Sequence, residues 1–148
     1  MAQQVVAWRY PPPYDFYDWD PTDDPELLSV PDSGTLAALD EAGELVGFVS
    51  FGGGGQVPGC LAAGHYDEPA LDVGLGLRPD LTGAGGGLAF VLAALDEGHR
   101  RFAPGTFRLT VAVFNERARR VYARAGFRPG PICFSPSHGV ETEFLVMT

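Results

Sequence analysis

A glycine-rich segment, residues 81–87 with the sequence LTGAGGG, limits the possible folds of this chain more than any other feature. Before it, Leu71–Leu77 alternates Leu or Val with Asp or Gly, which is typical of a β-strand with one buried face. After it, apolar residues recur at helical spacing from Leu88 onward. A glycine loop between a strand and a helix turns its backbone N–H groups inward, at the positive end of the helix dipole. This order therefore predicts a phosphate site.

The residues of this segment exclude two nucleotide-binding loops. A P-loop needs a lysine directly after its last glycine, and no lysine lies near residues 81–87. A dinucleotide fingerprint needs GxGxxG, but after Gly83 and Gly85 the position of the third glycine holds Leu88. The phosphate is therefore expected to belong to another class of ligand.

The remaining pattern predicts a mixed α/β sheet with helices on its faces, in one domain over residues 1–148. Strands are expected at residues 4–10, Thr35–Leu39, Leu45–Phe51, Leu71–Leu77, 107–114, 132–134 and 142–147. Helices are expected from Leu88 and after Asn115, which is a good N-cap. Prolines and aspartates at residues 11–25 leave little room for helices, and only residues 25–30 could add a turn, so the helical segment near the N-terminus is shortened.

Two blocks of residues lie on either side of the strand expected at 107–114. In the first, Pro79 precedes the loop that starts at Thr82. The second consists of Asn115, Ala118, Tyr122, Gly126 and Phe127. Together they resemble the GNAT superfamily of acyl-CoA N-acyltransferases, whose motifs are Arg/Gln-x-x-Gly-x-Gly/Ala and Asn-x-x-Ala-x-x-x-Tyr-x-x-x-Gly-Phe. The resemblance extends from about Gly34 to the C-terminus. It implies a GNAT-like fold, with one mostly antiparallel sheet and helices on both faces.

The resemblance implies that acetyl-CoA is the cosubstrate and that its acetyl group passes to a primary amine by direct attack in a ternary complex. The residues it implies for cosubstrate binding are Leu75, Gly76, Leu77, Thr82, Gly83, Ala84, Gly85, Gly86, Gly87, Leu88, Asn115 and Tyr122. Tyr122 takes the position of the family's general acid, which protonates the departing sulfur, although it could equally be a core tyrosine. Gly74 and Gly76 would leave room beside the pantetheine arm, or would pack closely against a helix.

The general base is less well defined. Asp72 is the only carboxylate on the strand before the loop and shares the glycine face, so it is the catalytic candidate; a solvated aspartate is the other interpretation. Thr110 stands where some family members carry a carboxylate. His65, Asp67 and Glu68 are weaker candidates. Thr82 replaces the family's usual Arg or Gln. These departures leave a second function open, a non-catalytic acyl-CoA sensor with the same fold.

Composition limits the partners and the location. The net charge of -9 opposes binding to nucleic acid and to anionic membranes, whereas the aromatic, acidic residues 10–24 suit a cationic amine acceptor, either a small molecule or a peptide. Cys60 and Cys133 form no CxxC pair, and no secretory signal is visible, so we expect no metal site, no disulfide and a cytoplasmic location. Shortened helices would leave part of the sheet poorly covered, which favours a homodimer.

Overall fold

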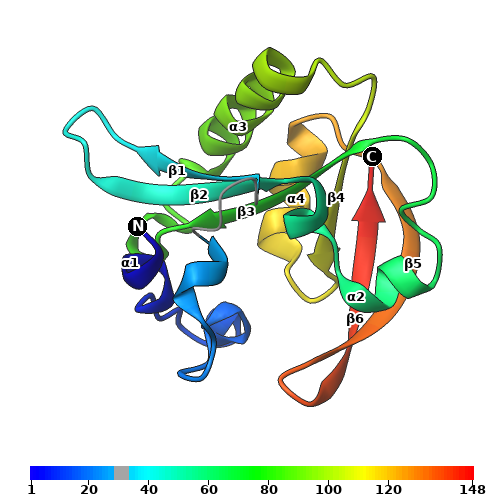
Figure 1. Cartoon of the computed structure of the whole chain (residues 1–148), viewed down its shortest axis with the longest axis horizontal. Helices are drawn as coiled ribbons and strands as arrows, with labels where there is room; N and C mark the ends of the chain where they lie inside the picture. The colour runs from blue at the N-terminus through cyan, green and yellow to red at the C-terminus, as the bar shows by residue number, and fades with distance from the viewer. Residues whose placement is uncertain (29–33) are drawn as a thin grey trace.

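The described residues, 1–28 and 34–148 of a computed structural model, form a six-stranded sheet with the strand order β1-β2-β3-β4-β6-β5 (Figure 1). The strands are β1 (Thr35–Leu39), β2 (Leu45–Phe51), β3 (Leu71–Leu77), β4 (Phe107–Ala112), β5 (Pro129–Ser137) and β6 (Val140–Met147). The strands predicted from residue 35 onward are confirmed. β4 ends two residues earlier than predicted, because the chain turns toward the next helix, and β5 and β6 extend further than predicted.

All neighbouring strands are antiparallel except β3 and β4, which run parallel. These two strands pair only at their first residues, Leu71 with Phe107 and Asp72 with Arg108. Beyond that point they diverge, and Figure 1 shows them pointing in clearly different directions. The divergence opens the middle of the sheet, where the backbone edges of β3 and β4 no longer pair with each other.

Helices cover both faces of the sheet, as predicted. α3 (Gly87–Phe102) and α4 (Glu116–Arg124) share one face, where Val91 and Ala94 of α3 pack on apolar residues of β2, β3 and β4. α2 (Pro58–Ala62) packs on the other face, in a cluster with Ala112 and Phe144. In the described part of the chain, no helix has the length and apolar character needed to cross a bilayer.

The first predicted strand is wrong. Residues 2–6 form the short helix α1 (Ala2–Val6), whose Val5 is buried with Leu28 and Leu45. The preference of Val for strands reflects packing on a sheet surface more than a backbone preference. Residues 2–6 pair with no strand, and Val5 is buried as part of a helix. Tertiary packing therefore overrides the strand preference of Val.

The N-terminal segment, defined here as residues 1–28, has only short helical turns, as its prolines predicted. Two 3-10 turns follow α1, η1 (Tyr14–Tyr17) and η2 (Pro25–Leu28); the last residues of the turn expected at 25–30 lie outside the described residues. Phe16 of η1 packs edge-on against Phe114 and lies near Phe144. The segment thus packs on the sheet face that carries Ala112 and Phe144. The edges of the sheet are β1 and β5.

A disulfide joins Cys60 of α2 to Cys133 of β5, with their Cα atoms 5.3 Å apart. This finding corrects the expectation of two unpaired thiols. The two cysteines are separated by 73 residues, so their spacing gave no sign of a pair. The chain between β2 and β3 contains α2, which brings Cys60 onto the face of the sheet that includes Cys133.

Candidate active site

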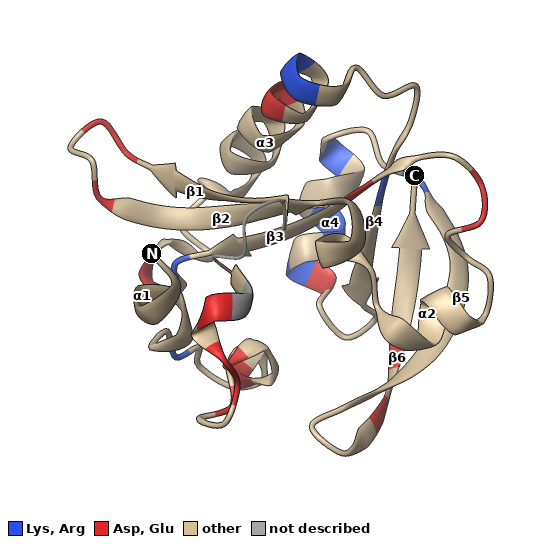
Figure 2. Cartoon of the chain, in the orientation of Figure 1, with Lys and Arg blue, Asp and Glu red and all other residues tan. Residues whose placement is uncertain are grey.

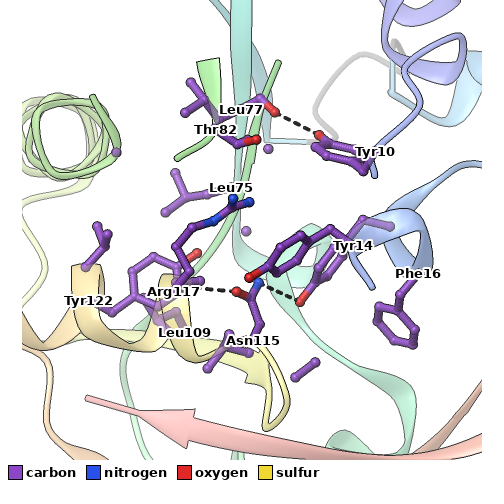
Figure 3. A pocket seen from close by; sticks show the side chains of 18 of the residues that line it. Tyr10, Tyr14, Phe16, Leu75, Leu77, Thr82, Leu109, Asn115, Arg117 and Tyr122 are labelled. Carbon is purple, nitrogen blue, oxygen red and sulfur yellow. Dashed lines mark hydrogen bonds between the residues drawn. The ribbon is translucent and has the colours of Figure 1, made fainter. Parts of the chain in front are cut away.

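A cleft of about 780 Å³ lies where β3 and β4 diverge. Its walls come from both strands, from the glycine loop, from α4 and from the N-terminal segment (Figure 3). This volume lies within the range of about 300–1,000 Å³ that is usual for small-molecule sites. The residues predicted for cosubstrate binding that line it are Leu75, Gly76, Leu77, Thr82, Gly83, Gly85, Gly87, Leu88, Asn115 and Tyr122. Ala84 and Gly86 belong to the same loop but do not line the cleft.

The glycine loop has the backbone shape that an anion site needs. Gly83 and Gly85 adopt positive φ angles of 72° and 86°, in the left-handed region that glycine tolerates best. In the described part of the chain, the backbone N–H groups of residues 83–88 take part in none of the loop hydrogen bonds. They are therefore available to a phosphate at the start of α3. The Thr82 hydroxyl is used differently, because it donates to the Pro79 carbonyl at 2.7 Å.

The two glycines of β3 have a packing reason. A Cβ on Gly74 would lie 3.1 Å from Gly55 Cα, and a Cβ on Gly76 would collide with the Phe48 ring. A Cβ at either position would therefore meet the chain itself, although both glycines also line the cleft. At the end of the strand, the Tyr10 hydroxyl donates to the Leu77 carbonyl at 2.8 Å (Figure 3).

Asn115, the residue before α4, and Tyr122 of α4 both line the cleft. Asn115 Oδ1 accepts from the Ala118 N–H at 3.0 Å and caps the helix as predicted, while its Nδ2 donates to the Tyr17 hydroxyl at 3.0 Å. Tyr122 is half-buried against Phe127 in the cluster beneath α3 and α4. Burial raises the pKa of its phenol well above the ordinary value of 10.0, with the nearby Tyr17 as a smaller cause. Its hydroxyl therefore stays protonated and can donate into the cleft.

Asp72 is placed away from the cleft and is fully engaged. Arg108 donates to both of its carboxylate oxygens, at 2.6 Å from Nε and 2.9 Å from Nη2, and Gln56 adds a third bond at 2.8 Å. Asp72 and Arg108 are both buried, and removing one partner of such a pair leaves an uncompensated charge. We therefore assign Asp72 to holding β3 against β4 at their paired end, and we do not retain it as the general base.

Arg117 is a site residue that the sequence reasoning missed. Its side chain rises from α4 into the cleft between Tyr122 and Tyr14 (Figure 3). The guanidinium lies over the Tyr14 ring, 4.0 Å from its centre, and reaches within 3.1 Å of where a Cβ on Gly83 would lie. The signal was present, since α4 carries four arginines in nine residues: Arg117, Arg119, Arg120 and Arg124.

The charges on the two sides of the cleft are opposite in sign. Arg117 and Arg124 line it from α4, while Asp18 and Asp23 line it from the N-terminal segment. Figure 2 shows the same division, with basic residues on α4 and acidic residues along the N-terminal segment. An anionic ligand is thus favoured on one side and a cationic ligand on the other.

His138, to which the sequence reasoning assigned nothing, also lines the cleft from the β5–β6 turn. Its Nε2 lies 2.9 Å from the Phe16 carbonyl and so ties this turn to η1. The loop candidates His65, Asp67 and Glu68 do not line the cleft. Among residues 1–28 and 34–148, no group of His, Cys, Asp and Glu side chains is arranged to hold a metal ion.

Comparison with solved structures shows a common fold. A chimera of the spermidine N-acetyltransferase SpeG from Vibrio cholerae and hSSAT aligns with a TM-score of 0.67 and 18% identity, over 88% of this chain and 79% of that one. A SpeG variant from the same organism aligns with a TM-score of 0.62 and 19% identity, over 83% and 70%. A protein provisionally assigned as a phosphinothricin N-acetyltransferase aligns with a TM-score of 0.67 and 18% identity, over 99% and 89%.

No curated protein matched this sequence significantly. Residues 2–127, however, match the sequence family described as acetyltransferase (GNAT), and this match covers both motif blocks and the strand between them. The six-stranded sheet, the divergence of β3 from β4 and the glycine loop before α3 agree with that match. The chain therefore belongs to the acetyltransferase (GNAT) family.

Proposed function

We propose that residues 1–148 act as one N-acetyltransferase unit that moves the acetyl group of acetyl-CoA to a primary amine by direct attack. The amine nitrogen forms a bond to the thioester carbonyl carbon, and the C–S bond then breaks. The nitrogen loses a proton and the sulfur gains one, so the products are an amide and the free thiol of CoA. The observation that carries this proposal is the cleft between β3 and β4, because it joins an anion-binding loop to a protonated phenol.

The residues of the cleft fit acetyl-CoA. The free N–H groups of residues 83–88 suit its pyrophosphate, and Arg117 beside Gly83 supplies the charge that Thr82 lacks. The diverging edges of β3 and β4 leave backbone groups for the amides of the pantetheine arm. Tyr122 is the proposed general acid for the departing sulfur.

The proposed acceptor is an amine that is cationic in solution. Asp18 and Asp23 attract an ammonium group, and the rings of Tyr10, Tyr14 and Tyr17 provide faces on which it can lie. The nitrogen must lose a proton before it attacks, and we propose that water in the open cleft removes it. Spermidine, for which two of the similar structures are named, is a reasonable first acceptor to test.

Thiol release from acetyl-CoA across a panel of amines tests the proposal. The panel contains polyamines, lysine, peptides with a free N-terminus and phosphinothricin. We expect at least one amine to raise thiol release well above the rate without amine, and mass spectrometry to find that amine acetylated. Calorimetry with CoA runs in parallel. Binding without turnover on any amine would instead favour the acyl-CoA sensor.

We further propose that the protein works in the cytoplasm, where acetyl-CoA is available. The disulfide between Cys60 and Cys133 opposes this location, because thiols are normally kept reduced there. Alkylation in intact cells, followed by denaturation and intact-mass measurement, resolves the conflict. If the protein is cytoplasmic, both cysteines are expected to be free thiols and to carry the alkyl group after unfolding in the absence of reductant. A mass with no alkylated cysteine would reject the location and leave the acetyltransferase activity as proposed.

A further inference from the structure

Tyr17, the last residue of η1, brings a phenol into the cleft, which Tyr10, Tyr14 and Tyr122 also line, and neither motif block contains it. It belongs to the N-terminal segment, whereas Tyr122 belongs to α4 on the opposite face of the sheet. Both residues line the cleft. Tyr17 and Tyr122 therefore approach it from opposite faces of the sheet.

The printed hydrogen bond of the Tyr17 hydroxyl leaves its proton for a ligand. Its oxygen accepts from Asn115 Nδ2 at 3.0 Å. A phenol has one donor and two acceptor sites, so this bond uses one acceptor site and not the donor. In the described part of the chain, no acceptor takes the hydroxyl proton. Tyr17 lines the cleft and keeps 36% of its surface accessible, so a ligand there can reach this donor.

The Tyr17 hydroxyl can donate its hydrogen bond only to a reacting atom that accepts one. An ammonium group only donates, and a neutral amine needs its lone pair for the attack, so neither can accept the Tyr17 proton. The thioester carbonyl oxygen and the departing sulfur only accept. Tyr122, which fills the general-acid position of the family motif, is already proposed for the sulfur. This leaves the carbonyl oxygen for Tyr17.

We propose that Tyr17 is a catalytic residue that donates a hydrogen bond to the carbonyl oxygen of the acetyl thioester. As the amine bonds to carbon, the C=O π electrons move onto oxygen, and they return when the C–S bond breaks. Tyr17 keeps its proton throughout, and the sulfur takes its proton from Tyr122. This inference rests on the proposed acetyltransferase function.

The surroundings of Tyr17 suit this role. Its ring is held by edge contacts with Phe16 at 5.0 Å and Tyr10 at 6.4 Å between ring centres. Loss of hydration among these rings is the main cause that raises the pKa of Tyr17, so the phenol stays protonated at neutral pH. The N–H of the Asn115 side chain acts against that shift and polarises the O–H bond toward its acceptor. A fixed, polarised donor is what a developing negative charge needs.

Tyr17→Phe tests the proposal, because it removes the donor and keeps the ring. We expect kcat for the best amine to fall about a hundredfold, the size seen when one donor to an oxyanion is lost. CoA affinity should change little, and the melting temperature should fall modestly because Asn115 Nδ2 loses its acceptor. Tyr66→Phe is the matched control: Tyr66 does not line the cleft, and its hydroxyl is likewise hydrogen-bonded, to the Val57 N–H and to Thr110. This control should lower the melting temperature and leave kcat within about twofold.

A double variant separates a direct role from support of Tyr122. If Tyr17 and Tyr122 act on different atoms, the losses in kcat multiply in the variant that carries both Phe substitutions. A double variant no slower than Tyr122→Phe alone would overturn the proposal, and so would an unchanged kcat in Tyr17→Phe. If the unaltered protein acetylates no amine, the proposed function itself fails, which is a distinct result.

Discussion

Replacing Tyr122 with Phe is expected to slow acetyl transfer by about a hundredfold or more, the usual size of a general-acid contribution. The ring stays in place against Phe127, so packing beneath α4 is kept and only the proton donor is lost. CoA affinity, measured by calorimetry, should barely change. The rate is measured as thiol release with the best amine of the panel.

The pH dependence gives an independent check on Tyr122. Burial raises its pKa above the ordinary 10.0, so the protonated form persists to higher pH than for a free tyrosine. The activity of the unaltered protein should therefore show no loss from this group below about pH 10. A structural tyrosine predicts a different outcome for Tyr122→Phe: full turnover, with stability lowered by about 1 kcal/mol if the hydroxyl was hydrogen-bonded. Full activity in the variant would end the catalytic role but leave the family membership intact.

Replacing Gly85 with Val is expected to abolish measurable CoA binding. Gly85 has a φ of 86° and nothing within 4 Å of a Cβ at this position, so the obstacle is backbone conformation and not space. A β-branched residue strongly disfavours positive φ, and the loop would have to change shape to accommodate it. Its N–H groups would then turn away from the pyrophosphate. Calorimetry with CoA and with acetyl-CoA measures the loss.

Gly43→Val is the matched control for this change. Gly43 lies in the β1–β2 turn, has a φ of 82° and likewise has nothing within 4 Å of where a Cβ would lie. It should therefore carry a similar backbone strain while leaving CoA affinity unchanged, because it lies outside the cleft. If Gly85→Val binds CoA as tightly as Gly43→Val does, the phosphate site is assigned to the wrong loop.

The sequence by itself determined the elements whose signals are local. Alternation over Leu71–Leu77 and the Val- and Phe-rich residues of Leu45–Phe51 predicted β3 and β2 with their bounds. Asn115 predicted the start of α4, and its side chain accepts from the Ala118 N–H as a cap should. The glycine loop was also predictable, because positive φ at Gly83 and Gly85 is a property of the residue itself. These signals, in their order, were sufficient to predict the family.

Tertiary structure alone decided which residues meet across the sheet. Asp72 pairs with Arg108, and Cys60 with Cys133, only because distant segments fold onto neighbouring strands or onto one face. Likewise, residues 2–6 became a helix because Val5 is buried between η2 and β2.

The active site depends on such contacts most of all. Tyr17 reaches Asn115, 98 residues away in the chain, and Arg117 points at the glycine loop because α4 packs beside α3. Local propensity carries no information on contacts between residues so far apart, since their free energy comes from burial and pairing in the folded chain. The sequence therefore predicted the glycine loop and the position of Tyr122 on α4, while the fold decided which side chains surround them.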